Sequence, residues 1–284
     1  MRGLALGIGL AVAASAAADA RADPPAETLF AAAASPSAGP AAAIGGYARG
    51  CLAGAAALPI DGAGYQAMRL SRQRRFAHPE LVDFVERLAA GLRAQGHPGL
   101  LVGDLAQARG GPMASGHRSH QSGLDVDIWY LPAPRERLSR AARETMSAVP
   151  LVTPGRLALE AERFAAFATA RVLRRAAEDP AVARIFVHPV VKRALCRRVD
   201  GERAWLRKIR PWWGHDHHFH VRLACPAGET ACVGQAPPPP GDGCDASLAW
   251  WFTTEPWAPS DAPPPEPLTL ADLPARCAAL VTAE

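Results

Sequence analysis

The chain lacks the short motifs that mark several large enzyme classes. It contains neither a G-x-S-x-G nor an S-x-x-K sequence, so the common forms of serine catalysis are not predicted. Ser119 and Ser122 are interpreted as turn residues. An H-E-x-x-H sequence and a C-x-x-C pair are also missing, which excludes a zinc site on one helix and argues against a cysteine-rich metal site. A catalytic metal would need ligands arranged in another way.

Lysine is scarce as well, since the basic residues are almost all arginine and only Lys192 and Lys208 are lysines. The 31 basic and 27 acidic residues give a formal net charge of +4. The small cluster of Arg72, Arg74 and Arg75 has no interleaved aromatic residues, so no nucleic-acid partner is predicted. Beyond the N-terminal segment no apolar run is long enough to cross a bilayer. The mature protein is therefore expected to have no membrane span, and no oligomeric state is predicted.

The N-terminal segment has the features of a secretory signal peptide. Met1-Arg2 is a short positive region, Leu4 to Ala17 is apolar, and Ala20-Arg21-Ala22 offers a cleavage site. Residues 1–22 are accordingly predicted to be a signal peptide, and the protein to be periplasmic. Residues 23–45 are interpreted as a low-complexity lead-in, of which the Ala/Ser/Pro segment Ala31–Ala43 is expected to be disordered, and residues 46–284 are long enough for one large domain.

Six cysteines, an even number in an exported chain, predict three disulfides. Fifteen pairings are possible. Spacing alone suggests one of them, Cys225 with Cys232, because these residues flank a turn-like segment.

The hydrophobic pattern predicts an α+β domain with a small, mainly antiparallel sheet flanked by helices and disulfide-stabilised loops. The expected elements are helices at Pro79–Gln95, Arg156–Glu178 and Val190–Arg197 and strands at Leu100–Leu105 and Ile185–Val187. His78, just before the first helix, is interpreted as a cap or core contact. The proline-rich stretches 237–240 and 263–267 cannot continue a sheet and are expected at the surface.

Two stretches, Ser115–Tyr130 and Trp212–Leu223, contain six of the nine histidines. Zinc binds imidazole and carboxylate groups, and a catalytic zinc uses three protein ligands. The segment Leu124–Tyr130 alternates apolar and polar residues like a half-buried strand, which places Asp125 and Asp127 on one face. The turn signal Gln121-Ser122-Gly123 would fold His120 back over the end of this strand.

The second stretch places His218 and His220 on another strand, on the face opposite apolar Phe219 and Val221. One imidazole could bind the metal while the other handles protons. The alternative interpretation is a metal-buffering tract or a solvated loop. The upstream histidine and carboxylate favour a zinc hydrolase over that alternative.

These residues give the chain a close resemblance to the penicillin-insensitive murein endopeptidase family, within the lysostaphin-like and D-Ala-D-Ala metallopeptidases. The resemblance runs from Gly50 to Cys277 and includes GHRSHQSGLDVDI and HVRL. It implies a zinc bound by His120, Asp127 and His220, while His117 also matches a metal-binding position, so which of His117 and His120 is the primary ligand stays open. It further implies His218 as the base or transition-state stabiliser, His215 as a second active-site histidine, and the disulfides Cys196–Cys244 and Cys51–Cys277.

The resemblance also implies a reaction, the hydrolysis of D-alanyl–meso-diaminopimelyl cross-bridges in peptidoglycan. Family members can hold a second zinc with an Asp and a His, but Met146–Thr153 contains neither, so one zinc is expected. A D-Ala-D-Ala dipeptidase or carboxypeptidase is one alternative, although such enzymes typically have Glu-x-x-His where this chain has His217-His218-Phe219-His220. The other alternative is a non-catalytic murein-binding module.

Overall fold

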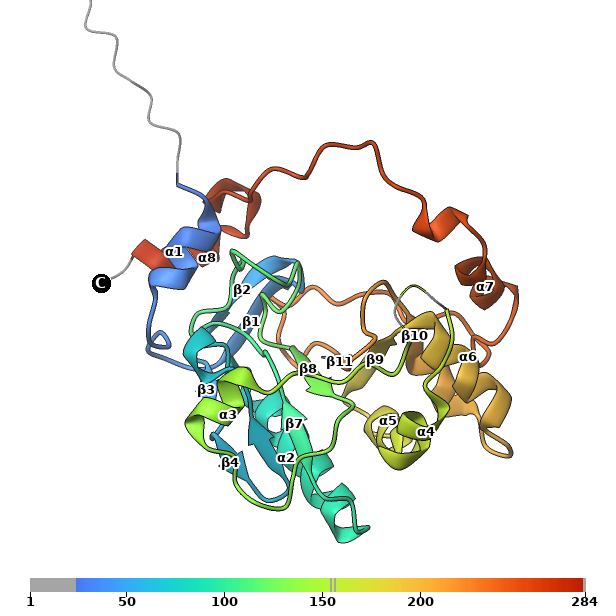
Figure 1. Cartoon of the computed structure of the whole chain (residues 1–284). Helices are drawn as coiled ribbons and strands as arrows, with labels where there is room; N and C mark the ends of the chain where they lie inside the picture. The colour runs from blue at the N-terminus through green and yellow to red at the C-terminus, as the bar shows by residue number, and fades with distance from the viewer. Residues whose placement is uncertain (1–23, 154, 156, 283–284) are drawn as a thin grey trace, which may run out of the picture.

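A mixed sheet of seven strands, in the order β10-β9-β11-β8-β7-β5-β4, carries the two histidine-rich stretches (Figure 1). The computed structural model describes residues 24–153, 155 and 157–282; the predicted signal peptide and Arg156 lie outside them. The strands are β4 (Asp61–Gly62), β5 (Tyr65–Ala67), β7 (Leu100–Val102), β8 (Asp125–Trp129), β9 (Val182–Val187), β10 (Ile209–Pro211) and β11 (His218–Leu223). Only the pairs β10·β9 and β5·β7 are parallel, so the expected α+β class with a mainly antiparallel sheet is confirmed.

Two small two-stranded antiparallel sheets and a set of helices surround this sheet. One is the hairpin of β1 (Ala42–Gly46) with β2 (Arg49–Ala53), and the other pairs β3 (Ala56–Ala57) with β6 (Phe76–Ala77). The α-helices are α1 (Ala26–Ala32), α2 (Pro79–Ala94), α3 (Arg140–Thr145), α4 (Ala161–Ala166), α5 (Thr169–Ala177), α6 (Pro189–Arg198), α7 (Ala246–Ala249) and α8 (Ala275–Thr282), and the 3-10 turns are η1 (Leu70–Arg72), η2 (Ala204–Lys208), η3 (Trp250–Phe252), η4 (Glu255–Trp257) and η5 (Leu270–Asp272). Within the described residues, none of the helices combines the length and the apolar character that crossing a bilayer requires.

Strands β8 and β11 lie side by side and set the geometry of the site. They pair antiparallel with His220 opposite Asp127 and Arg222 opposite Asp125. Their alternate residues, Val126, Ile128, Phe219 and Val221, are fully or almost fully buried in the main core. Because side chains alternate along a strand, the histidines and aspartates share the opposite face, as the sequence predicts.

Helices α2 and α6 begin in the same way, with a histidine followed by proline. The His78 and His188 side chains each cap their helix by accepting a hydrogen bond from the backbone N–H two residues later. Proline suits the first helical position because its missing N–H would have no partner there. The expected helix at Pro79–Gln95 and the capping role of His78 are confirmed.

The single long helix expected at Arg156–Glu178 is wrong. Two shorter helices, α4 and α5, take its place, and Ala168 between them has a left-handed backbone with φ of 50°. The change of direction lets Phe164 of α4 and Leu173 of α5 both reach the main core. In one straight helix Phe164 and Leu173, nine positions apart, would point to opposite sides, so both could not face the same core.

The segment Ala31–Ala43, expected to be disordered, has regular structure at both of its ends. Helix α1 occupies Ala26–Ala32, and strand β1 begins at Ala42. Phe30 of α1 is fully buried in a second apolar cluster that also contains Leu273 and Cys277. Residues near the C-terminus supply the apolar partners of Phe30, and these partners cannot be inferred from the composition of the lead-in.

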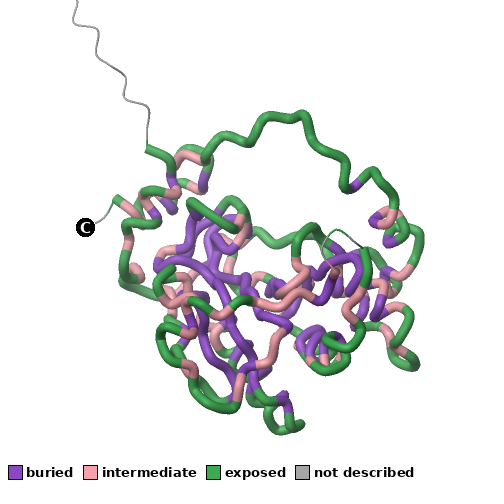
Figure 2. Tube along the Cα trace, viewed as in Figure 1, coloured by how far each residue is buried: buried purple, intermediate pink, exposed green. Residues whose placement is uncertain are grey.

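Three disulfides close the fold, Cys51–Cys277, Cys196–Cys244 and Cys225–Cys232. They are the pairing suggested by spacing together with the two implied by the family resemblance. The first ties β2 to α8 across 226 residues. Between η4 and that helix the chain runs as an extended strap, residues 258–267, which is exposed throughout (Figures 1 and 2).

We expect the Cys51→Ser/Cys277→Ser double variant to lose the most stability of the three disulfide deletions. A cross-link restricts the unfolded chain more when its loop is longer, which gives a loss on the order of 4–5 kcal/mol for this pair and about 2 kcal/mol for the 7-residue Cys225–Cys232 separation. Denaturant unfolding without reductant measures both losses. Equal losses for the two variants would contradict the prediction.

Candidate metal centre

Asp127 stands at the centre of a group of histidines drawn from both stretches. Its Oδ1 lies 3.5 Å from His120 Nε2, 3.4 Å from His220 Nδ1 and 3.6 Å from His218 Nε2. Its Oδ2 lies 3.5 Å from His117 Nδ1. Strand β8 supplies the aspartate, β11 supplies two imidazoles, and the loop before β8 supplies the other two.

Each of the three histidines His117, His120 and His220 has its second ring nitrogen close to another oxygen, through a hydrogen bond in His117 and His120 and through an ion-pair contact without hydrogen-bond geometry in His220. Asp104 Oδ2 lies 3.0 Å from His117 Nε2, the Leu105 carbonyl accepts a hydrogen bond of 2.9 Å from His120 Nδ1, and Asp125 Oδ1 lies 2.9 Å from His220 Nε2. Metal-binding histidines are oriented by such contacts to carboxylates and carbonyls. One nitrogen of each ring is thereby left facing Asp127.

The residues present fit a divalent metal ion. His117, His120 and Asp127 each offer a ligand atom within 4.8 Å of the others. His120 Nε2 and Asp127 Oδ1 are buried without a hydrogen-bond partner, and buried polar atoms without partners are unfavourable. A cation between them would satisfy both, and a set of imidazole and carboxylate ligands suits zinc.

A strained turn brings His120 into this group. His120 is fully buried and has a left-handed backbone with φ of 68°. Its backbone N–H donates a 2.9 Å hydrogen bond to Asp125 Oδ2. Asp125 in turn accepts hydrogen bonds of 2.7 and 3.1 Å from the Arg222 guanidinium. Strained residues of this kind persist where surrounding contacts hold them, and they concentrate at functional sites.

Burial and neighbouring charges set the protonation of the group. Burial raises the pKa of Asp127, but His218 and His120 outweigh it and hold this pKa well below its usual range. Burial lowers the pKa of His218 to about 3 and that of His220 to about 4, against the attraction of Asp127 and Asp125 respectively. Burial also lowers the pKa of His120, but there the charge of Asp127 outweighs burial and raises that pKa. Because an ionised carboxylate and neutral imidazoles are the forms that bind metal, His120 would release its proton on binding.

His215 and His218 lie next to each other beside the cluster. Their ring centroids are 4.9 Å apart, and His215 Nδ1 is 2.7 Å from the Trp213 carbonyl. His215 also has a left-handed backbone, with φ of 57°. Burial lowers its pKa, against the opposing charge of Asp127. Two neutral imidazoles at the rim can exchange protons with a reacting group.

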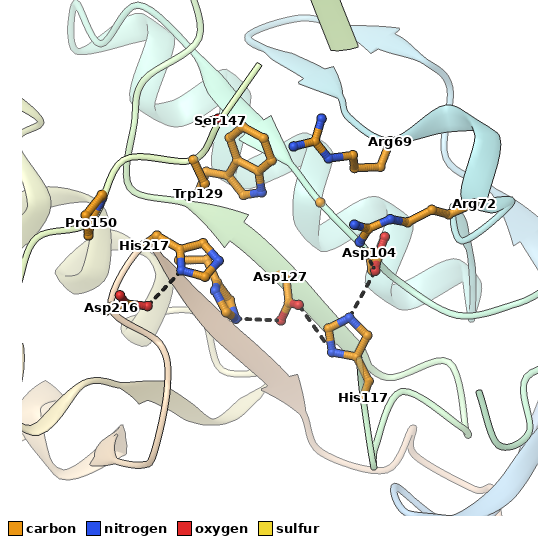
Figure 3. A pocket seen from close by; sticks show the side chains of 13 residues that line it. Arg69, Arg72, Asp104, His117, Asp127, Trp129, Ser147, Pro150, Asp216 and His217 are labelled. Carbon is orange, nitrogen blue, oxygen red and sulfur yellow. Dashed lines mark hydrogen bonds and ion pairs between the residues drawn. The ribbon is translucent and has the colours of Figure 1, made fainter. Parts of the chain in front are cut away.

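Two cavities border the cluster and share His117. The smaller, about 430 Å³, contains Asp104, Asp127, His217 and His218, with Arg72 on its wall (Figure 3). The larger, about 930 Å³, lies along the β1–β2 turn, Arg118 and the strap. A ligand extending from one cavity to the other would pass the metal ligands.

Sequence reasoning missed Asp104, which orients His117. The Asp104 side chain is almost fully buried and accepts hydrogen bonds from Arg72 (2.9 Å) and Arg74 (3.2 Å) on the same oxygen that meets His117. Asp104 lies two residues after the end of β7. A carboxylate just after a strand is the sequence feature that could have marked it as a candidate site residue. The basic cluster singled out in the sequence thus packs partly onto this carboxylate.

We expect Asp104→Asn to weaken zinc binding by roughly 10- to 100-fold, because Asp104 orients His117, which in turn contacts the Asp127 carboxylate, and losing such an outer contact of a metal site usually has an effect of this size. Competition with a coloured chelator measures the affinity. Asp216→Asn is the matched control, because Asp216 lines the same cavity but contacts His217 instead of the cluster. Equal zinc affinity in the Asp104 variant and the wild type would show that the contact does not support the metal site.

Comparison with known proteins places the chain in a family. The sequence profile of the penicillin-insensitive murein endopeptidases matches residues 43–282. A penicillin-insensitive murein endopeptidase of Klebsiella pneumoniae is 43% identical over 246 residues, covering 87% of this chain and 88% of the relative. Proteins of the same description from Yersinia pestis (43% over 250 residues, 87% of each chain) and Haemophilus influenzae (44% over 243 residues, 81% of each chain) are similarly close. By sequence along nearly its whole described length, the chain belongs to the penicillin-insensitive murein endopeptidase family.

Proposed function

We propose that the protein is a zinc-dependent endopeptidase that hydrolyses D-alanyl–meso-diaminopimelyl cross-bridges of peptidoglycan in the periplasm. The observation that carries the proposal is the group of His117, His120 and His220 around Asp127, each ring oriented by a separate oxygen. The relatives are named for cleavage of murein. The predicted signal peptide supports the location.

In this proposal His120, Asp127 and His220 hold the zinc, and His117 adjoins the same carboxylate. Bound zinc would supply a Lewis acid and lower the pKa of the attacking water. One metal is proposed, because the segment 146–153 contributes Ser147, Ala148 and Pro150 to the cavity wall, none of which is a metal ligand.

The chain's own residues would then move the protons. Burial keeps His218 neutral, so it can accept the proton of the attacking water as the water oxygen bonds to the D-alanyl carbonyl carbon. When the carbon–nitrogen bond breaks, the same imidazolium can donate that proton to the leaving amine. His215, beside His218, would brace the imidazole or the negative oxygen of the transition state.

The two cavities favour an endopeptidase over a D-Ala-D-Ala dipeptidase or carboxypeptidase. A dipeptide needs little room beyond the scissile bond, whereas a cross-link continues into a peptide on both sides. Open cavities of about 430 and 930 Å³ border the cluster at His117. The three oriented histidines around one carboxylate also argue against a non-catalytic murein-binding module, because binding alone does not require a metal site.

Digestion of purified sacculi tests the proposal. We expect mass spectrometry of the soluble products to show cross-linked muropeptides converted to monomers, with activity lost to a chelator, restored by zinc and unchanged by penicillin. Release of free D-alanine or its dipeptide without loss of cross-links would instead support the carboxypeptidase or dipeptidase alternative. Binding to sacculi without any product would support the non-catalytic one.

A further inference from the structure

The larger cavity has an uneven distribution of charge along its length. Near the cluster it is lined by His117, Arg118 and Arg222. At its other wall stand three acidic residues, Glu27 of α1, Glu266 of the strap and Asp272 of η5, and one cation, exposed Arg49 of β2, which interacts with Asp272, so this wall keeps a net negative charge. A ligand with one negative group would therefore place that group at the end near the metal ligands, away from the acidic wall.

The arginines at that end differ in their availability. Arg222 is buried and occupied by Asp125 and Gln235, to which it donates hydrogen bonds. Arg118 is exposed, and among the described residues its guanidinium makes no hydrogen bond or ion pair. It also directly follows His117 in the chain. Arg118 is thus the cation at this end that is available to bind a ligand.

The proposed substrate has a carboxylate where Arg118 could meet it. In a D-alanyl–meso-diaminopimelyl bond the scissile nitrogen is attached to a carbon that also bears a free carboxylate. That group stays within two bonds of the nitrogen at the cluster. Arginine binds a carboxylate through two parallel hydrogen bonds and keeps its charge at all working pH values.

We propose that Arg118 binds the carboxylate next to the scissile nitrogen, and that the larger cavity receives the peptide that leaves as the amine. This assignment rests on the proposed function and specifies which of the two linked peptides occupies which cavity. The donor peptide, which carries the D-alanyl carbonyl, then occupies the smaller cavity beside His218.

Two sugar-free cross-linked peptides test the assignment, identical except that one has the free carboxylate next to the scissile nitrogen and the other a carboxamide. We expect the wild type to prefer the free carboxylate in kcat/KM by roughly 10- to 100-fold, as for a charge-assisted contact. Arg118→Ala should lose that preference by slowing only the free-carboxylate peptide, and Arg118→Lys should restore part of it. Arg140→Ala, which changes an exposed arginine of α3 that lines neither cavity, should behave as the wild type.

The same peptides are also titrated by NMR against zinc-loaded His218→Ala and His218→Ala/Arg118→Ala proteins, where no turnover is needed. If the free-carboxylate peptide binds more tightly than the carboxamide, and this difference disappears in the Arg118→Ala variant, the assignment is supported. Failure of the wild type to cleave either peptide would refute only the proposed function. An equal effect of Arg118→Ala on both peptides, in rate and in binding, would overturn it. Circular dichroism and melting of the Arg118 variants exclude a folding defect as the cause.

Discussion

Replacement of Asp127 by alanine is expected to remove both the bound zinc and the hydrolytic activity. Asp127 is the carboxylate that His117, His120, His218 and His220 all face. Without it the histidines lose their shared negative partner, and the metal loses its one anionic ligand. His120→Ala and His220→Ala are expected to have the same outcome.

Elemental analysis of the purified variants measures the zinc, and digestion of sacculi measures the activity. Asp216→Ala is the matched control, since Asp216 lines the same cavity but accepts its hydrogen bond from His217. It should retain a full equivalent of zinc. An Asp127→Ala protein that also retained a full equivalent would refute the ligand assignment.

His218→Ala is expected to retain zinc and lose activity by roughly 10²–10⁴-fold, the usual contribution of a positioned proton-transfer group. His218 Nε2 lies 3.6 Å from Asp127, but within the described part of the chain the other ring nitrogen of His218 has no oxygen close to it, unlike those of His117, His120 and His220. This difference assigns it to proton transfer or oxyanion stabilisation and not to the metal.

The neighbouring His217→Ala variant separates this role from a general effect of losing an imidazole. His217 is 44% exposed and pairs with Asp216, so its loss should change kcat by only a small factor. The zinc content and kcat of both variants are measured on the same preparations. Unchanged turnover in zinc-loaded His218→Ala would exclude the proposed role.

The strand pair that carries the site could be predicted from sequence because its signal is local. Alternation along Asp125–Trp129 and His218–Leu223 fixes which side chains share a face, and the observed register places His220 opposite Asp127. The turn that returns His120 to the strand end follows from Gly123, which has a left-handed backbone with φ of 73°.

The parts that could not be predicted depend on partners distant in sequence. Asp104 orients His117 across 13 residues; its place after a strand marks it as a candidate site residue but does not identify His117 as its partner. Helix α1 forms because Phe30 buries itself against the C-terminal Leu273 and Cys277. The break at Ala168 likewise lets Phe164 of α4 and Leu173 of α5 both pack in the main core. Here tertiary packing overrides local helix propensity.

The exposed strap and the Cys51–Cys277 disulfide together determine what a protease would produce from this protein. Extended, solvent-exposed segments are preferred cleavage sites, and residues 258–267 are such a segment. A cut there separates the peptide chain into two pieces, yet the Cys51–Cys277 bond still joins them covalently. The nicked, two-chain protein would keep α8 docked on the second apolar cluster and would migrate as one species until a reductant was added.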